Sequence, residues 1–286
     1  MKKQDVMEED WDYLIILDAC RYDYFEKVYT QYVEGDLEKR NSDAGATQEW
    51  LYNTFPNDYD YFDISYFSAN PWINSKGFSL KDMDASYDWC ASHTFNHIVD
   101  LWEHYWDEDI GTVKPNKVVE GFHKAPKMKR SIIHFVQPHL PFIHPESKFK
   151  MIWGGKKKIE NERKYKDEKQ VSILKRIRNY LFYDINRKIF RDKLLEWRIR
   201  KIFDVPPLNR YEEIYQLGQL DRVPEFYEHS IKESLNAVLE IIDSAEGKIV
   251  ITADHGECFG EYNTWGHENE NHNPILTTVP WCELEV

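Results

Sequence analysis

The residues that first suggest chemistry stand in the stretch DHGE, which begins with Asp254 and His255. This stretch follows an apolar run, residues 249–252, and a second glycine–histidine pair, which contains His267, comes ten residues further on. Carboxylate oxygens and imidazole nitrogens are common ligands of divalent cations. Two interpretations are therefore open: these side chains are ordinary polar loop groups, or they are metal ligands held where a strand ends.

Two more apolar segments end in polar residues of the same kind. Residues 13–19 (YLIILDA) end near Asp18, and His139 follows the apolar part of residues 130–142 (RSIIHFVQPHLPF). Each residue alone has a plain structural interpretation, because a strand-end aspartate is often a helix N-cap and a lone histidine is more often a structural hydrogen-bonding group. In open α/β sheets, however, ligands bind at the carboxyl ends of the strands. Three polar strand ends in one sheet favour a site for a divalent cation.

A candidate nucleophile lies between the first and second predicted strands. Thr47 follows the small residues Ala44, Gly45 and Ala46 and opens a helical pattern, so its hydroxyl is expected at a helix N-terminus. A structural N-cap and a reactive hydroxyl have the same placement, because free N–H groups at a helix start favour an anion and a nearby metal ion acidifies the hydroxyl. Ser42 is the rival nucleophile, and the sequence leaves both open.

The elements that position these residues alternate between strand and helix. The pattern predicts an α/β fold with a mostly parallel central sheet and helices on both faces. The predicted strands are residues 13–19, 59–70, 130–142, 248–254 and 277–286, and the clearest predicted helices are residues 20–32 and 224–247.

The composition limits the class of protein. The chain has 286 residues and a formal net charge of −13 at pH 7, so no nucleic-acid partner is expected. The sequence has no apolar stretch of 18 residues and no apolar signal-peptide region after Met1, which predicts neither a transmembrane helix nor a secreted protein. Its four cysteines form no CxxC pair. We therefore expect a cytoplasmic protein with reduced thiols.

Basic residues are concentrated in one segment. Residues 150–201 hold 18 of the 37 Lys and Arg residues and only seven acids, a local net charge of +11 that leaves −24 for the rest of the chain. Such a run is often a solvated helix face; it also suits a cap that attracts an anionic substrate or makes peripheral contact with an anionic membrane. We expect one domain over residues 1–286, with residues 150–210 as a basic helical insertion or cap within it.

Together, the order of these residues resembles the alkaline phosphatase/sulfatase superfamily, most nearly its sulfatase-like members. LIILDACRYDYF is similar to the opening Asp-x-x-Arg-x-Asp motif, ADHGECFGE with the later GH to the closing motif, and VPW to the strand after it. HFVQPHLPF is similar to the segment that supplies a substrate-binding histidine. The resemblance covers residues 11–145 and 210–286 and leaves out the basic segment. It implies an alkaline phosphatase-like fold.

The resemblance also implies roles for individual residues. Asp18, Asp254 and His255 would bind a divalent metal ion, and Thr47 would bridge to it and attack the substrate. His139, and likewise His267, would contact the anionic group being transferred or protonate the leaving oxygen. Arg21 would orient Asp18 or neutralise charge. Glu257 would support a ligand, although a solvated loop acid is an equal interpretation.

Two departures from the family pattern refine the expected reaction. The segment ATQEW lacks the proline and arginine of the Cys/Ser-x-Pro-x-Arg motif that sulfatases proper oxidise to formylglycine. An unmodified threonine is similar instead to phosphodiesterase and phosphotransferase branches, such as lipoteichoic acid synthase or the phosphoethanolamine transferases. Two-metal members need a further aspartate and two histidines. Candidate imidazoles exist, but no third aspartate is evident; the candidates are His139, His144, His267 and His272.

We therefore expect a metal-dependent hydrolase or transferase of phosphate esters. The cofactor would be Zn, Mn, Mg or Ca, with one metal ion favoured over two. The substrate would be an anionic small molecule, a glycan or a lipid-linked molecule. The alternatives are a sulfatase with the same fold and a non-catalytic binding protein that retains the fold.

Overall fold

The computed structural model describes residues 1–57, 59–83, 85–150 and 192–286. The basic cap, its helical pattern and the membrane contact are predicted in residues 150–210. Of these, residues 151–191 lie outside the described residues. The last part of this insertion forms helix α8 (Lys193–Ile202), and Asp192 caps α8 by accepting hydrogen bonds from the N–H groups of Leu194 and Leu195.

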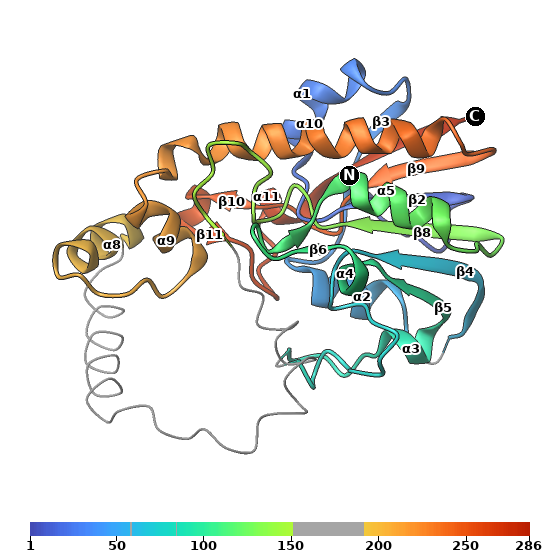
Figure 1. The fold of residues 1–286 in the computed structure, drawn as a ribbon, viewed down its shortest axis with the longest axis horizontal. Helices are drawn as coiled ribbons and strands as arrows, with labels where there is room; N and C mark the ends of the chain where they lie inside the picture. The colour runs from blue at the N-terminus through green and yellow to red at the C-terminus, as the bar shows by residue number, and fades with distance from the viewer. Residues whose placement is uncertain (58, 84, 151–191) are drawn as a thin grey trace.

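The described residues form an eight-stranded sheet in the order β1-β3-β12-β9-β2-β8-β4-β5 (Figure 1). Every pairing is parallel except those of β12, which runs antiparallel to both β3 and β9. The strands are β1 (Lys2–Lys3), β2 (Tyr13–Leu17), β3 (Asp36–Asn41), β4 (Tyr61–Ser68), β5 (Phe95–Asp100), β8 (Arg130–Phe135), β9 (Lys248–Thr252) and β12 (Thr278–Glu285). The expected mostly parallel α/β sheet is confirmed.

Helices cover both faces of this sheet because its central strands bury alternate residues on opposite sides. In β2, Ile15 and Leu17 join the core under α1 (Tyr22–Val28), α5 (Pro115–Lys124) and α10 (Val223–Ile242), whereas Leu14 and Ile16 join the core under α2 (Thr47–Thr54). Figure 1 shows α10 along the top of the view, with α8 and α9 (Arg210–Gln216) to the left, beyond the strands.

Short elements complete the described chain. Small helices lie in the loops around the sheet, and two short antiparallel pairs, β6–β7 and β10–β11, lie outside it. Their bounds are α3 (Ala91–Thr94), α4 (Leu101–His104), α11 (Pro274–Thr277), η1 (Tyr29–Gln31), η2 (Leu220–Arg222), η3 (Glu261–Asn263), β6 (Trp106–Asp107), β7 (Thr112–Val113), β10 (Cys258–Phe259) and β11 (Trp265–Gly266).

The predicted elements differ from the observed ones mainly at their ends. The strand predicted over 130–142 ends at Phe135, before the two prolines that lack a backbone N–H for a ladder, and the helix predicted over 224–247 ends at Ile242. β3 was not predicted, because its residues are largely charged and exposed.

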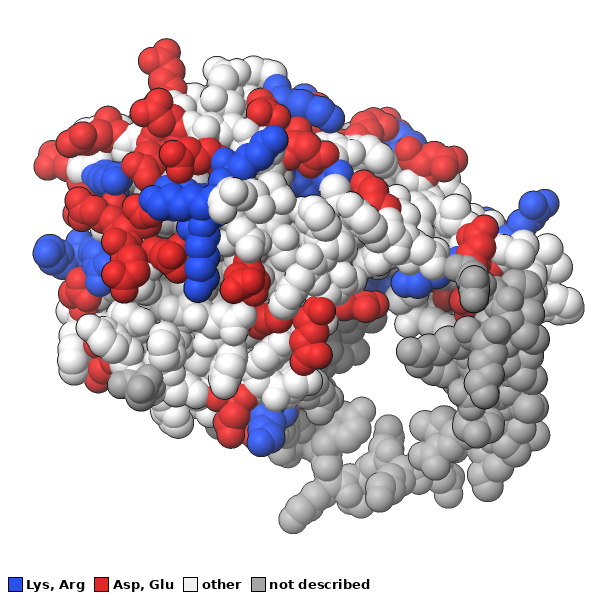
Figure 2. Space-filling model, turned by 180° about the vertical axis from the view of Figure 1, so that it is seen from behind, with Lys and Arg blue, Asp and Glu red and all other residues white. Residues whose placement is uncertain are grey.

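Surface charge and hydropathy agree with the composition. No helix in the described ranges combines the length and apolarity that a membrane crossing requires. In the view of Figure 2, the basic side chains of the described residues lie among acidic ones and form no purely basic surface. Most of the segment predicted to form the positive patch, residues 151–191, lies outside the described residues.

Candidate functional site

Strand register brings the polar strand ends to one edge of the sheet. Leu17, the last residue of β2, pairs with Phe135 of β8, and Ile16 pairs with Thr252 of β9. Asp18 follows β2 at once, and Asp254 comes two residues after β9. Because these strands are parallel, their carboxyl ends coincide, and the two carboxylates come together at the place where open α/β sheets bind ligands.

Four predicted metal-binding residues converge at this edge. The Nε2 atom of His255 lies 3.5 Å from Asp254 Oδ2, 3.7 Å from Asp18 Oδ1 and 3.3 Å from Thr47 Oγ1. All four side chains are buried. The ends of β2 and β9 and the start of α2 thus present three oxygens and one nitrogen to a common centre.

The two carboxylates each leave one oxygen without a partner. Asp18 Oδ2 accepts a hydrogen bond from Asn70 Nδ2 at 2.7 Å, and Asp254 Oδ1 accepts from the N–H groups of Ala19 and His255, both at 2.9 Å. Asp18 Oδ1 and Asp254 Oδ2 accept none from any described residue. Buried anionic oxygens without partners are costly unless a cation or a proton joins them.

The donor set fits a divalent cation. Burial and the proximity of Asp254 raise the pKa of Asp18 well above its usual range, which is the expected result of two carboxylates that share a site without a counter-ion. His255 is neutral, because burial lowers its pKa, and its Nδ1–H donates to the Gly256 carbonyl at 2.7 Å. Its Nε2 lone pair therefore faces the unpartnered oxygens. Hard oxygens with one imidazole suit Zn, Mn, Mg or Ca.

The loop before Thr47 is held in place by its own contacts. Thr47 is the first residue of α2, and Glu49 accepts a hydrogen bond from the Gly45 N–H at 2.8 Å, which fixes the turn. Gly45 also lies so close to the 268–271 loop that a Cβ there would be 2.4 Å from the Glu268 carbonyl oxygen. The rival hydroxyl, Ser42, donates to the Ala44 carbonyl at 3.2 Å. Of the two candidates, Thr47 is the one hydrogen-bonded to His255.

His139 and His267 lie beside this centre with fixed tautomers. The Nδ1–H of His139 donates to the Leu140 carbonyl at 2.5 Å, and that of His267 donates to Glu257 Oε2 at 2.6 Å. Their ring centroids are 5.0 Å apart, and the His255 and His267 rings are 4.3 Å apart. Both Nε2 atoms are therefore left for interactions within the site. Burial, with His267 nearby, lowers the pKa of His139 well below its usual range and keeps that ring neutral.

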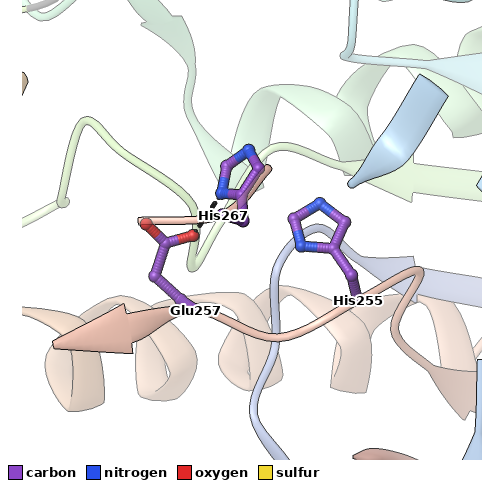
Figure 3. Close-up of side chains that lie close together, drawn as sticks. All are labelled: His255, Glu257 and His267. Carbon is purple, nitrogen blue, oxygen red and sulfur yellow. Dashed lines mark hydrogen bonds and ion pairs between the residues drawn. The ribbon is translucent and has the colours of Figure 1, made fainter. Parts of the chain in front are cut away.

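Glu257 is a buried orienting group, in contrast to the alternative of a solvated loop acid. One of its oxygens accepts from His267 and the other accepts from the Tyr211 hydroxyl at 2.6 Å. Although burial alone raises the pKa of Glu257, the adjacent His267 outweighs it and lowers that pKa. Figure 3 shows Glu257 and His255 on either side of the His267 ring. Ligand atoms of these three residues all lie within 4.8 Å of one another.

Three predicted contributors lie elsewhere. No hydrogen bond or ion pair of the described chain joins Arg21 to Asp18; the guanidinium binds Asp23 at 2.9 Å and Glu261 at 2.7 Å. His144 packs on α10, with its ring 4.8 Å from that of His229. His272 pairs with the Glu49 carboxylate at 2.8 Å. Arg21 therefore ties α1 to the loop after β9, and the two histidines are not grouped with the strand-end cluster.

Several residues of the site were not predicted. Asn70 follows β4 and could have been found by the strand-end argument that found Asp18. His134 lies within β8; its Nδ1 is 2.8 Å from the Tyr66 hydroxyl, and its Nε2 is 3.9 Å from Asp18 Oδ2. Burial lowers the pKa of His134 to about 4. No sequence signal marks this residue, because its pattern is that of an ordinary strand.

Arg210 was also missed. It is the first residue of α9, and its Nη1 lies 3.3 Å from His139 Nε2. The sequence assigns it to the end of the insertion, so nothing in the pattern connects it to the strand ends.

Comparison with known proteins gives structural matches only. No protein-family model and no curated protein matches the sequence. Among solved structures, the integral membrane lipooligosaccharide phosphoethanolamine transferase A of Neisseria meningitidis is similar, with 12% identity and a TM-score of 0.51 over 96% of this chain and 47% of that one. The periplasmic domain of phosphoethanolamine transferase EptC of Campylobacter jejuni has 14% identity and a TM-score of 0.45 over 95% of this chain and 78% of that one.

A protein of the alkaline phosphatase superfamily from Vibrio parahaemolyticus is a more distant match, with 13% identity and a TM-score of 0.35 over 97% of this chain and 60% of that one. The chain spans about half the length of the Neisseria protein. At these identities the likeness concerns the fold. The likeness to the Neisseria protein therefore supports the expected α/β fold.

Proposed function

We propose that the protein is a metal-dependent hydrolase or transferase of phosphate esters with Thr47 as its nucleophile. One observation carries the proposal: two buried carboxylate oxygens without partners, on Asp18 and Asp254, face the His255 lone pair and the Thr47 hydroxyl. Without a bound cation or a proton, these oxygens would stay uncompensated at a cost of about 1–3 kcal/mol each, and more for charged groups.

Asp18, Asp254, His255 and Thr47 would hold one divalent cation. When bound, such a cation lowers the pKa of a neighbouring hydroxyl and polarises a phosphoryl oxygen. The chain itself supplies the placement of the nucleophile. Thr47 stands at the N-terminus of an eight-residue helix, whose free N–H groups favour the negative charge that gathers during attack.

The proposed reaction consists of two successive displacements at phosphorus. In the first, Thr47 gives up its hydroxyl proton to solvent as its oxygen forms a bond to phosphorus, the bond from phosphorus to the leaving oxygen breaks, and that oxygen takes the electron pair and a proton from water. In the second, water or an acceptor hydroxyl gives up a proton and bonds to phosphorus, the bond to Thr47 breaks, and the Thr47 oxygen takes back the electron pair and a proton. His267 would contact the phosphoryl oxygens through Nε2 when that atom is protonated, because its Nδ1–H is engaged by Glu257. His139 would do the same only after gaining a second proton, because its Nδ1–H is engaged by the Leu140 carbonyl.

Phosphate is proposed over sulfate because Thr47 cannot become formylglycine by the sulfatase route. The substrate class is proposed by fold analogy: the Neisseria protein is a lipooligosaccharide phosphoethanolamine transferase, so a glycan or lipid-linked phosphoester is a reasonable substrate here. We also propose that the protein is a single domain with an insertion at residues 150–210. This insertion would make peripheral contact with an anionic membrane, and the protein would be located in the cytoplasm. The four cysteines are free, which suits a reducing compartment.

The test compares three substrates and traps the intermediate. Wild type, Thr47→Ala and Ser42→Ala should be loaded with Mn or Zn and assayed on an aryl phosphate, a phosphodiester and an aryl sulfate. We expect one metal ion per chain, turnover of a phosphate ester, and loss of at least about 1,000-fold in kcat for Thr47→Ala, because the nucleophile is gone while little packing is lost. Mass spectrometry of acid-quenched wild type should find phosphate on Thr47.

Each failure points to one alternative. Faster turnover of the aryl sulfate supports the sulfatase alternative, and a dead Ser42→Ala variant with an active Thr47→Ala variant assigns the nucleophile to Ser42. Metal binding without turnover of any ester supports a binding protein that retains the fold.

A further inference from the structure

Arg210 brings a positive charge to the site from outside the sheet. It lies at the start of α9, and its Nη1 is 3.3 Å from the Nε2 atom of His139. Among the described residues, this contact with His139 is the hydrogen bond that the Arg210 guanidinium makes. No carboxylate of a described residue lies within ion-pair distance of that guanidinium. By contrast, two nearby guanidiniums, those of Arg200 in α8 and Arg222 in η2, pair with glutamates.

The positions of the protons on His139 decide which residue donates in the Arg210–His139 hydrogen bond. The Nδ1–H of His139 is used by the Leu140 carbonyl, so Nε2 carries the lone pair and Arg210 must be the donor. The lone pair that a second metal ion would need at His139 is therefore already occupied. A guanidinium always carries its charge, and it offers planar paired N–H groups that match the oxygens of a phosphoryl group.

The two residues that follow Arg210 in α9 fix its position through two separate contacts. Tyr211, the next residue, donates to the buried Glu257, which also orients His267. Glu212, one residue further on, forms a buried ion pair with Arg200 of α8 at 2.6 Å. α9 is thus anchored to the loop after β9 and to α8, and Arg210 is the first residue of this anchored helix.

We propose that Arg210 is a catalytic residue that binds the phosphoryl oxygens of the substrate and supplies, in place of a second metal ion, the second positive charge of the site. The inference rests on the proposed function. The N–H groups of Arg210 turn from His139 to the phosphoryl oxygens when substrate binds. Arg210 transfers no proton; it stabilises the charge on these oxygens while the bond from Thr47 to phosphorus forms and the bond to the leaving oxygen breaks.

The experiment separates anion binding from metal binding. Inorganic phosphate and vanadate should be titrated by calorimetry into the Mn-loaded Thr47→Ala protein, in which turnover is absent, and into the same protein carrying Arg210→Ala or Arg210→Lys. We expect Arg210→Ala to weaken phosphate binding by on the order of 10- to 100-fold, since it removes charge-assisted hydrogen bonds. Arg210→Lys should recover part of the loss, because it keeps the charge and loses the paired geometry.

Three controls make the result specific. Arg222→Ala removes a guanidinium of the same segment that is already paired with Glu146 and Glu225, and it should leave phosphate binding unchanged. The metal content and Mn affinity of Arg210→Ala should equal those of its parent. Guanidinium ion at millimolar concentration should partly restore phosphate binding to Arg210→Ala; a variant with a general structural defect would not respond to it.

Two outcomes overturn the inference. Two tightly bound metal ions per wild-type chain would assign the second charge to a metal. Unchanged phosphate affinity in Arg210→Ala would remove Arg210 from the anion site. In both cases the phosphorylated Thr47 intermediate can still be found, so the proposed function and this inference fail separately.

Discussion

Replacement of Asp18 by asparagine should stabilise the metal-free protein and abolish its response to metal. In the metal-free site, Asp18 Oδ1 and Asp254 Oδ2 are buried oxygens without hydrogen-bond partners in the described chain, and burial beside Asp254 raises the pKa of Asp18. Asp18→Asn keeps an oxygen to accept the Asn70 hydrogen bond, now at 2.7 Å, and replaces Oδ1 with an amide donor. That donor faces the His255 lone pair at the present distance of 3.7 Å.

The expected changes in stability differ between the metal-free and the metal-bound protein. Removal of one unpartnered buried oxygen should raise the free energy of unfolding of the metal-free protein by about 1–3 kcal/mol. In wild type, metal at 100 times its dissociation constant adds about 2.7 kcal/mol. With a change of roughly 2–4 °C per kcal/mol for a chain of this size, metal should raise the Tm of wild type by about 5–10 °C. Asp18→Asn should show no such rise.

Thermal unfolding followed by circular dichroism provides the assay. Wild type and Asp18→Asn are each measured with excess chelator and then with added Mn or Zn. Asp243→Asn, which removes an exposed carboxylate at the end of α10, is the control and should behave as wild type. A wild type indifferent to chelator and metal, together with a metal-free Asp18→Asn that is less stable than metal-free wild type, would refute the reasoning that these oxygens await a cation.

Two further predictions concern the groups that support the site. Glu257→Gln should lower kcat by about 10- to 100-fold with unchanged metal content, since its single amide oxygen cannot accept from both Tyr211 and His267 and its negative charge is gone; steady-state kinetics beside metal analysis would show it, and an unchanged kcat would contradict it. Glu49→Gln should lower the free energy of unfolding by about 1–2 kcal/mol at pH 7, because Glu49 accepts hydrogen bonds from Gly45, Glu270 and His272. Burial alone raises the pKa of Glu49, but these partners lower it below 4.5, so this contribution is present above that pH and is lost as pH falls through the folded-state pKa. Denaturant titrations from pH 3 to pH 7 should therefore show the difference between wild type and Glu49→Gln shrinking toward acid; a constant difference would contradict it.

The sheet and its ligand edge were predictable because central parallel strands carry their own signal. β2 and β9 are buried on both faces, so their sequences are continuous apolar runs that stop where the polar residues begin. Asp18, Asp254 and His255 stand directly after those runs. β3 escaped prediction because four of its six residues are charged, and a charged segment has the pattern of a loop.

The residues that escaped prediction depend on tertiary packing. His134 belongs to a strand whose periodicity shows only that it is buried, and its place near Asp18 and Asp254 follows from strand order. Arg210 reaches the site because α9 packs on the loop after β9, a contact between segments 46 residues apart for Tyr211 and Glu257. Local sequence carries no information on such a contact.

The two halves of the site therefore have different structural origins. The proposed metal-binding half is built from strand ends whose positions are fixed by the hydrogen-bond register of the sheet. The proposed anion-binding half depends on α9, whose side-chain contacts include Tyr211 to Glu257 and Glu212 to Arg200. A change in α8 or α9 can therefore alter which phosphorylated group is bound while Asp18, Asp254 and His255 keep their arrangement. Under the proposed mechanism, substrate choice resides in the segment that follows the basic insertion, and the phosphoryl chemistry resides in the sheet.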